Sequence, residues 1–144
     1  MKSEFVTSKR HVWNIMRYSE ILLNFAEAMV EAYGDPNYKD GYPMSAKEAV
    51  DIVRSRVHVD MPPFPNNLTL NEFKAKLRNE RRVELSFEDH RFWDIRRWKI
   101  ADQTTDIYGV DITKKEDGSF SYKKVLVEKR IFKDCMYLLS LIHI

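Results

Sequence analysis

Two carboxylates one helical turn apart, Glu80 and Glu84, are the side chains whose type and spacing could do chemistry. On a helical wheel at about 100° per residue they share a stripe with Phe73, Leu77 and Phe87. We therefore expect both acids to face inward, where an unpaired charge is costly. A pair of carboxylates held in this way is one arrangement used for glycoside hydrolysis.

The surrounding residues favour a structural interpretation of the two acids. The stretch is rich in arginine, at Arg78, Arg81, Arg82, Arg91, Arg96 and Arg97. A guanidinium group matches a carboxylate geometrically, and it would hold both acids ionised, whereas catalysis needs one raised pKa. We predict no catalytic residue and a structural ion-pair network that holds this helix to residues 91–98. Its members are Glu80, Arg81, Glu84, Arg91, Asp94 and Arg96.

Other kinds of site find little support in the sequence. Glu88, Asp89, His90 and Asp94 could supply metal ligands, but no second histidine is near and the arginines would oppose a cation. We interpret His90 as a polar turn residue and predict no metal and no cofactor. The phosphate-loop, nucleophile-elbow and zinc-protease patterns are missing from the sequence. With Cys135 as the single cysteine, no intramolecular disulfide can form and thiol catalysis has no support.

Composition indicates a globular chain without a strong charge bias. Of 144 residues, 24 are Lys or Arg and 22 are Asp or Glu, which does not argue for a nucleic-acid partner. Aromatic residues make up 12%, and most are expected in the core. Tyr38, Tyr42 and Tyr108 are possible ring platforms for a flat ligand such as a sugar, or else packing and turn residues.

The apolar spacing predicts three main helices. The first runs from about residue 13 to 33, with Tyr18, Ile21, Leu22, Phe25, Ala26, Met29 and Val30 facing inward, and Gly34 ends it. Capping boxes begin the other two, Ser45 with Glu48 and Thr69 with Glu72. The second is expected to end near Val57 with that residue on its buried side, and the third near Phe87.

The rest of the chain predicts a short helix and a hairpin. A helix or turn is expected over residues 91–98, and strands over residues 108–112 and 120–127, with Asp117-Gly118 in the turn. The fold class is therefore mainly α, with a TPR-like antiparallel helix pair plus a long helix and a small C-terminal β-hairpin.

Three blocks resemble one protein family. Residues 17–28 read RYSEILLNFAEA and residues 49–57 read AVDIVRSRV. Residues 79–98, NERRVELSFEDHRFWDIRRW, are similar to the "ERRVELAFEGHRFFDLRRW" block of the SusD/RagB family of outer-membrane nutrient-binding lipoproteins. The resemblance covers about residues 13–137, with the blocks in the family's order.

The resemblance implies a non-enzymatic protein on the cell surface. Family members are lipid-anchored at the outer membrane and bind glycans, or sometimes peptides, for a SusC-like TonB-dependent transporter. Their ligand contacts are variable loop side chains, so the resemblance assigns no ligand-binding residue here. Two alternatives stay open: a generic TPR-like helical protein-interaction module, and an acid/base glycoside hydrolase using Glu80 and Glu84.

The resemblance also predicts how the chain is divided. Residues 1–138 match the C-terminal portion of a SusD/RagB-like domain, so the lipid anchor and export signal are expected upstream. Residues 139–144 depart from the family's proline-rich ending and are expected to be a non-native tail.

Overall fold

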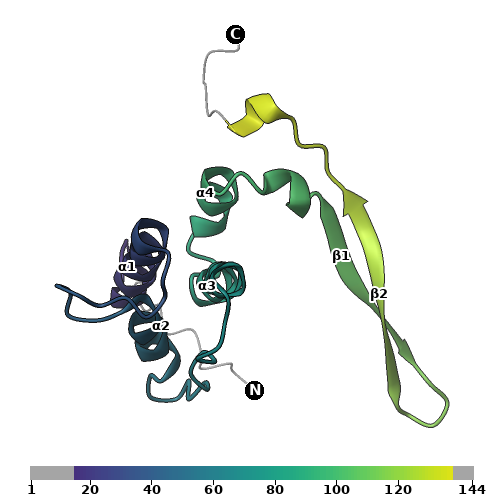
Figure 1. Ribbon diagram of the computed structural model, residues 1–144. Helices are drawn as coiled ribbons and strands as arrows, with labels where there is room; N and C mark the ends of the chain where they lie inside the picture. The colour runs from purple at the N-terminus through teal and green to yellow at the C-terminus, as the bar shows by residue number, and fades with distance from the viewer. Residues whose placement is uncertain (1–14, 138–144) are drawn as a thin grey trace, which may run out of the picture. The chain divides into compact units, whose positions relative to one another are not determined.

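The computed structural model describes residues 15–137, which form two compact units that divide after Leu85 (Figure 1). The first unit contains α1 (Tyr18–Tyr33), α2 (Ala46–Arg54) and α3 (Leu70–Glu84). The second contains α4 (His90–Arg97), the 3-10 turns η1 (Ala101–Thr104) and η2 (Asp134–Tyr137), and the strands β1 (Asp106–Lys114) and β2 (Phe120–Lys129). The mainly α class with a C-terminal hairpin is confirmed, whereas the TPR-like character of α1 and α2 stays a prediction.

In the first unit α1 packs against both α2 and α3 (Figure 1). Gly34 ends α1 as predicted, because its left-handed backbone (φ 68°) lets its N–H donate to the Val30 carbonyl. The buried face is centred near Ala26 and includes Leu23, which is fully buried. Tyr18 and Ile21, expected to face inward, are exposed. Because α1 contacts two helices, its buried face is shifted from the expected one towards Leu23.

The second helix begins at the predicted capping box. The Ser45 side chain accepts from the Glu48 N–H, and the Glu48 carboxylate accepts from the Ser45 N–H at 2.8 Å. The prediction that it reaches Val57 was wrong, because α2 ends at Arg54 and Val57 is exposed. The chain turns there, and the Met61 N–H donates to the Arg54 carbonyl at 3.0 Å.

The third helix also has its predicted capping box, formed by Thr69 and Glu72. Its buried face carries Phe73 and Leu77, and the Phe73 ring meets the Phe64 ring edge-on at 5.7 Å. Phe87 was expected on this face, but it lies beyond the helix with φ 64° and is 100% exposed. The helical wheel fails there because α3 ends at Glu84.

The second unit is thinly packed. β1 and β2 pair antiparallel, with Tyr108 opposite Leu126 and Ile112 opposite Tyr122. Gly118 takes φ 83° in the turn, as the Asp117-Gly118 pair predicted. Across residues 106–129, all of which the structure describes, no side chain is fully buried.

The segment after β2 returns to α4. The Arg96 guanidinium lies over the Phe92 ring at 3.6 Å, and its Nε donates to the Met136 carbonyl at 3.3 Å. The Tyr137 hydroxyl donates to Asp102 at 3.2 Å. Cys135 lies in this segment and its thiol is free and exposed.

No helix within residues 15–137 is both long enough and apolar enough to span a membrane. Residues 139–144, predicted to be a non-native tail, lie outside the described part of the chain.

Candidate functional site

Glu84 accepts hydrogen bonds from residues that flank two other helices. It is the last residue of α3, and its side chain is only 12% exposed. Arg17, just before α1, donates to its carboxylate and to its carbonyl oxygen. Arg56, just after α2, donates to the same carboxylate at 2.6 Å and to the Ser19 hydroxyl at 2.8 Å. One carboxylate therefore joins the ends of three helices of the first unit.

These contacts determine the protonation of Glu84. Burial raises its pKa, but the hydrogen bonds from Arg17, Arg56 and Ser19 together lower it further than burial raises it. The net pKa of Glu84 lies below the usual value, so the carboxylate is ionised at neutral pH. A general acid would need the opposite shift.

Glu80 faces inward as predicted and is paired within the same unit. Its side chain is 16% exposed and forms a salt bridge with Arg54, the last residue of α2. Arg54 also donates from Nε to the Pro62 carbonyl at 2.7 Å, and its guanidinium lies 4.9 Å from the Phe64 ring centre. The salt bridge therefore ties α3 to α2 and to the proline-rich connector.

The other members of the predicted ion-pair network have contacts of their own. Arg81 is buried and donates to the Asn24 amide oxygen at 2.5 Å. Asp94 is buried and pairs with Arg97 at 2.9 Å. Arg96 donates to the Phe92 carbonyl at 3.0 Å and to the Met136 carbonyl at 3.3 Å. Arg91 is half-buried on α4. That the six residues form one network, and that it holds α3 to residues 91–98, stay predictions.

Three arginines that pair with the two acids could not be picked out from the sequence: Arg17, Arg54 and Arg56. Each of the three arginines lies at or beside a helix end, within or next to the blocks quoted above. That position was the available signal, since a cation at a helix end can reach a neighbouring helix end.

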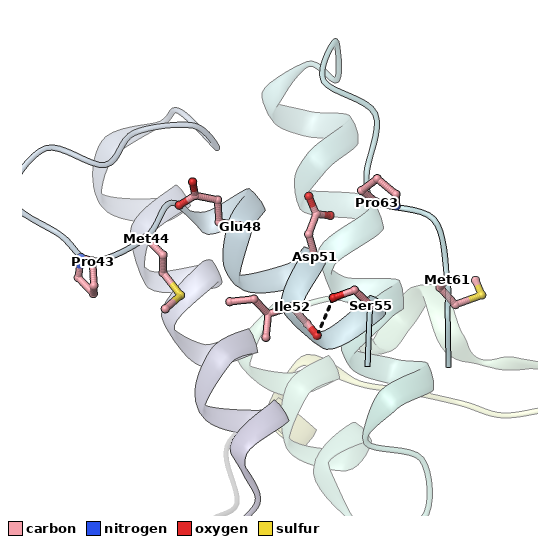
Figure 2. Close-up of a pocket in the computed structure, with 8 residues that line it drawn as sticks. All are labelled: Pro43, Met44, Glu48, Asp51, Ile52, Ser55, Met61 and Pro63. Carbon is pink, nitrogen blue, oxygen red and sulfur yellow. Dashed lines mark hydrogen bonds between the residues drawn. The ribbon is translucent and has the colours of Figure 1, made fainter. Parts of the chain in front are cut away.

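A groove of about 550 Å³ lies along α2 and the loops on either side of it (Figure 2). Its lining consists of Pro43, Met44, Glu48, Asp51, Ile52, Ser55, Met61 and Pro63. Figure 2 shows the α2 side chains between Pro43 and Met44 on one side and Met61 and Pro63 on the other.

The polar groups of this groove already have partners. Asp51 accepts from the Phe64 N–H at 2.8 Å and pairs with Lys47 at 2.6 Å. Glu48 serves the capping box and pairs with Lys39. What the groove offers a ligand is therefore mainly the apolar surface of its methionines, isoleucine and prolines.

A cluster of three tyrosines lies at the C-terminal end of α1. The Tyr33 and Tyr38 rings stack at 4.0 Å with 15° between their planes, and Tyr42 meets Tyr33 edge-on at 5.7 Å. Tyr38 and Tyr42 were considered as ring platforms from the sequence, whereas Tyr33 was missed because it was counted only as the end of the helix. Tyr108, the other platform considered, lies on β1 beneath the Lys124 ammonium at 3.9 Å.

Within residues 15–137 no group of three or more His, Cys, Asp or Glu side chains could hold a metal ion. His90, interpreted as a turn residue, is instead the first residue of α4 and is half-buried.

The comparisons with known proteins agree with one another. A family model described as "SusD family" matches residues 3–139. The chain is 29% identical over 111 residues to "SusD-like protein P2" of Formosa agariphila, a match that covers 74% of this chain and 21% of the relative. The chain thus spans about a fifth of the length of that relative. No solved structure matches the chain.

Proposed function

Because the chain belongs to the SusD family, we propose that it is part of a protein that binds a glycan or similar nutrient without cleaving it. The proposal locates this protein at the outer membrane, exposed on the cell surface, where it delivers its ligand to a SusC-like TonB-dependent transporter. An oligosaccharide is the preferred ligand, and a peptide is the other. The observation that carries the proposal is the family match over residues 3–139.

The surroundings of the two acids support binding without catalysis. Glu84 has a lowered pKa and accepts from two arginines, and Glu80 is paired with Arg54. A retaining or inverting glycosidase needs one carboxyl group that is protonated at working pH. The partners of Glu84 lower its pKa instead, and the Glu80 carboxylate faces the Arg54 guanidinium.

A helical protein-interaction module is the second candidate, and the groove along α2 favours it. Met44, Ile52 and Met61 give that groove an adaptable apolar lining of the kind that accepts varied side chains. This candidate predicts that the chain binds a protein partner and no sugar.

Calorimetry against a panel of neutral oligosaccharides, followed by product analysis, tests the proposed function. We expect heat of binding for at least one sugar and recovery of that sugar at its original length. Release of new reducing ends would contradict the non-enzymatic assignment. Absence of binding to any sugar, together with binding of the chain to a protein partner other than a SusC-like barrel, would favour the second candidate.

A further inference from the structure

The tyrosine cluster, defined as Tyr33, Tyr38 and Tyr42, leaves much of its aromatic surface in contact with solvent. Tyr33 is 42% exposed and Tyr42 is 39% exposed. Tyr38 is half-buried and packs against the core, and Tyr42 meets the Phe25 ring edge-on at 6.3 Å. Tyr38 and Phe25 therefore support the two more exposed rings from below, so the outer aromatic surface belongs mainly to Tyr33 and Tyr42.

The loop that carries the cluster is held in place by local hydrogen bonds. The Asp35 carboxylate accepts from the Asn37 N–H at 2.8 Å, and the Tyr42 N–H donates to the Lys39 carbonyl at 2.9 Å. Lys39 also pairs with Glu48 on α2 at 3.0 Å. A ligand that packs on this surface does not have to order the loop first, so little of the binding free energy is lost to ordering.

The hydroxyl groups of the cluster give it a polar edge. The Tyr33 and Tyr42 hydroxyl oxygens are 2.6 Å apart. Because one hydroxyl donates to the other, the acceptor keeps its own proton and the donor keeps its lone pairs. The hydrogen bond with Tyr42 raises the pKa of Tyr33, so the Tyr33 phenol stays neutral at physiological pH. The pair can therefore offer a donor and an acceptor beside the ring faces.

This combination matches the chemistry of a sugar ring. One face of a pyranose presents C–H groups, which pack on the negative face of an aromatic ring, and its rim presents hydroxyl groups. The charges of the loop further restrict which class of sugar can bind. Asp35 and Asp40 are acidic, and the one lysine of the loop, Lys39, is neutralised by Glu48. Uronates and phosphates would therefore be repelled.

We propose that the tyrosine cluster is a binding site for a neutral pyranose of an oligosaccharide, which stacks on the exposed rings and hydrogen-bonds the paired hydroxyls. This inference rests on the proposed function and assigns residues to it. Tyr33 is the most exposed residue of the three, so we expect it to carry the largest share of the affinity.

The experiment is titration calorimetry of the full 144-residue chain with hexasaccharides of glucose, xylose, galactose and mannose, and with hexagalacturonate as the charged sugar. We expect a neutral hexasaccharide to bind with Kd on the order of 1 mM or tighter. The variant Tyr33→Ala should weaken this binding by about tenfold, which corresponds to about 1.4 kcal/mol. Tyr33→Phe, which keeps the ring and loses the hydroxyl, should weaken it less.

Tyr18→Ala is the matched control, since Tyr18 is an exposed tyrosine at the opposite end of the same helix. It should bind the sugar as the wild type does, and circular dichroism checks that each variant is folded. If the wild type binds a neutral sugar and both Tyr33 variants bind it equally well, the inference is wrong and the proposed function stands. If hexagalacturonate alone binds, the assignment of the site to neutral sugars is wrong. If nothing in the panel binds the wild type, the inference fails, and the proposed function then depends on its peptide alternative.

Discussion

At the scale of single residues, Glu84 links more of the first unit than any other side chain described above. Its carboxylate accepts from Arg17 and Arg56, and Ser19 adds a further hydrogen bond. Removing one member of a nearly buried charged group costs more than the group contributes net, because the remaining charges lose their partner. We therefore expect Glu84 to contribute to the stability of the fold.

The variant Glu84→Gln should lower the free energy of unfolding by about 2 to 3 kcal/mol, since two guanidinium groups lose their charged acceptor. Urea denaturation at pH 7 measures the change. Glu31→Gln is the control: Glu31 also forms a salt bridge, with Lys74 at 2.7 Å, but its side chain is half-exposed. That change should cost at most about 1 kcal/mol. Equal losses in the two variants would contradict the assigned role of Glu84.

The lowered pKa of Glu84 makes a further prediction about acid. Its folded-state pKa lies below the ordinary glutamate value of 4.5, so its contribution to stability is present above pH 4.5 and is lost as the pH falls through the folded-state pKa. The stability difference between wild type and Glu84→Gln should therefore be constant from pH 7 to about pH 5 and shrink below that. Urea titrations across this range test the prediction. A stability difference that grows towards acid pH would mean that folding raises the pKa of Glu84 and does not lower it.

At the scale of elements, the starts of α2 and α3 could be predicted from the sequence more accurately than their ends. The first helix shows the reverse, since Gly34 ends it as predicted but α1 begins at Tyr18 and not near residue 13. The boxes at Ser45 and Thr69 are local, because each needs only a glutamate three residues later. The ends near Val57 and Phe87 were placed too late, because long-range packing and left-handed backbone decide them.

The candidate site was also only partly predictable from local sequence signals. Periodicity along a single helix placed Glu80 and Glu84 inward correctly. Their arginine partners could not be deduced in this way, since Arg17 is 67 residues from Glu84, and Arg54 is 26 residues from Glu80. Side-chain spacing within one element carries no information about which element packs beside it.

The two capping boxes should each have a measurable energy. Ser45→Ala and Thr69→Ala should each lower the free energy of unfolding by about 1 kcal/mol, because a helix N–H loses its side-chain acceptor. Ser55→Ala serves as the control, since the Ser55 hydroxyl is exposed and only donates weakly to the Ile52 carbonyl at 3.4 Å. Thermal or urea denaturation gives the comparison. A loss at Ser55 as large as at Ser45 would show that hydroxyl removal itself, and not capping, is being measured.

At the scale of the whole molecule, the two units differ in how much they bury. The cluster of buried apolar side chains lies in the first unit, with Leu23, Val30, Val50 and Phe73 almost completely enclosed. In the second unit, over residues 86–137, the buried residues are Asp94 and Ala101. A two-stranded hairpin without a buried face is marginally stable in water.

Amide hydrogen exchange should therefore separate the units. Backbone amides of α1 and α2 should be the most protected, whereas those of β1 and β2 should exchange at rates closer to those of an unfolded chain. Mass spectrometry of peptic fragments after timed exchange measures both regions in one sample, so each serves as the reference for the other. Protection in residues 106–129 equal to that of α1 would mean that the hairpin is covered in solution.

The free thiol of Cys135 has a practical consequence for all these measurements. Because Cys135 is exposed and is the single cysteine of the sequence, a maleimide fluorophore will attach at one position, in the second unit. The tyrosine cluster belongs to the first unit. A dye whose emission changes during a sugar titration would therefore report that the second unit senses the ligand, and a silent dye on a sugar-binding chain would confine the response to the first.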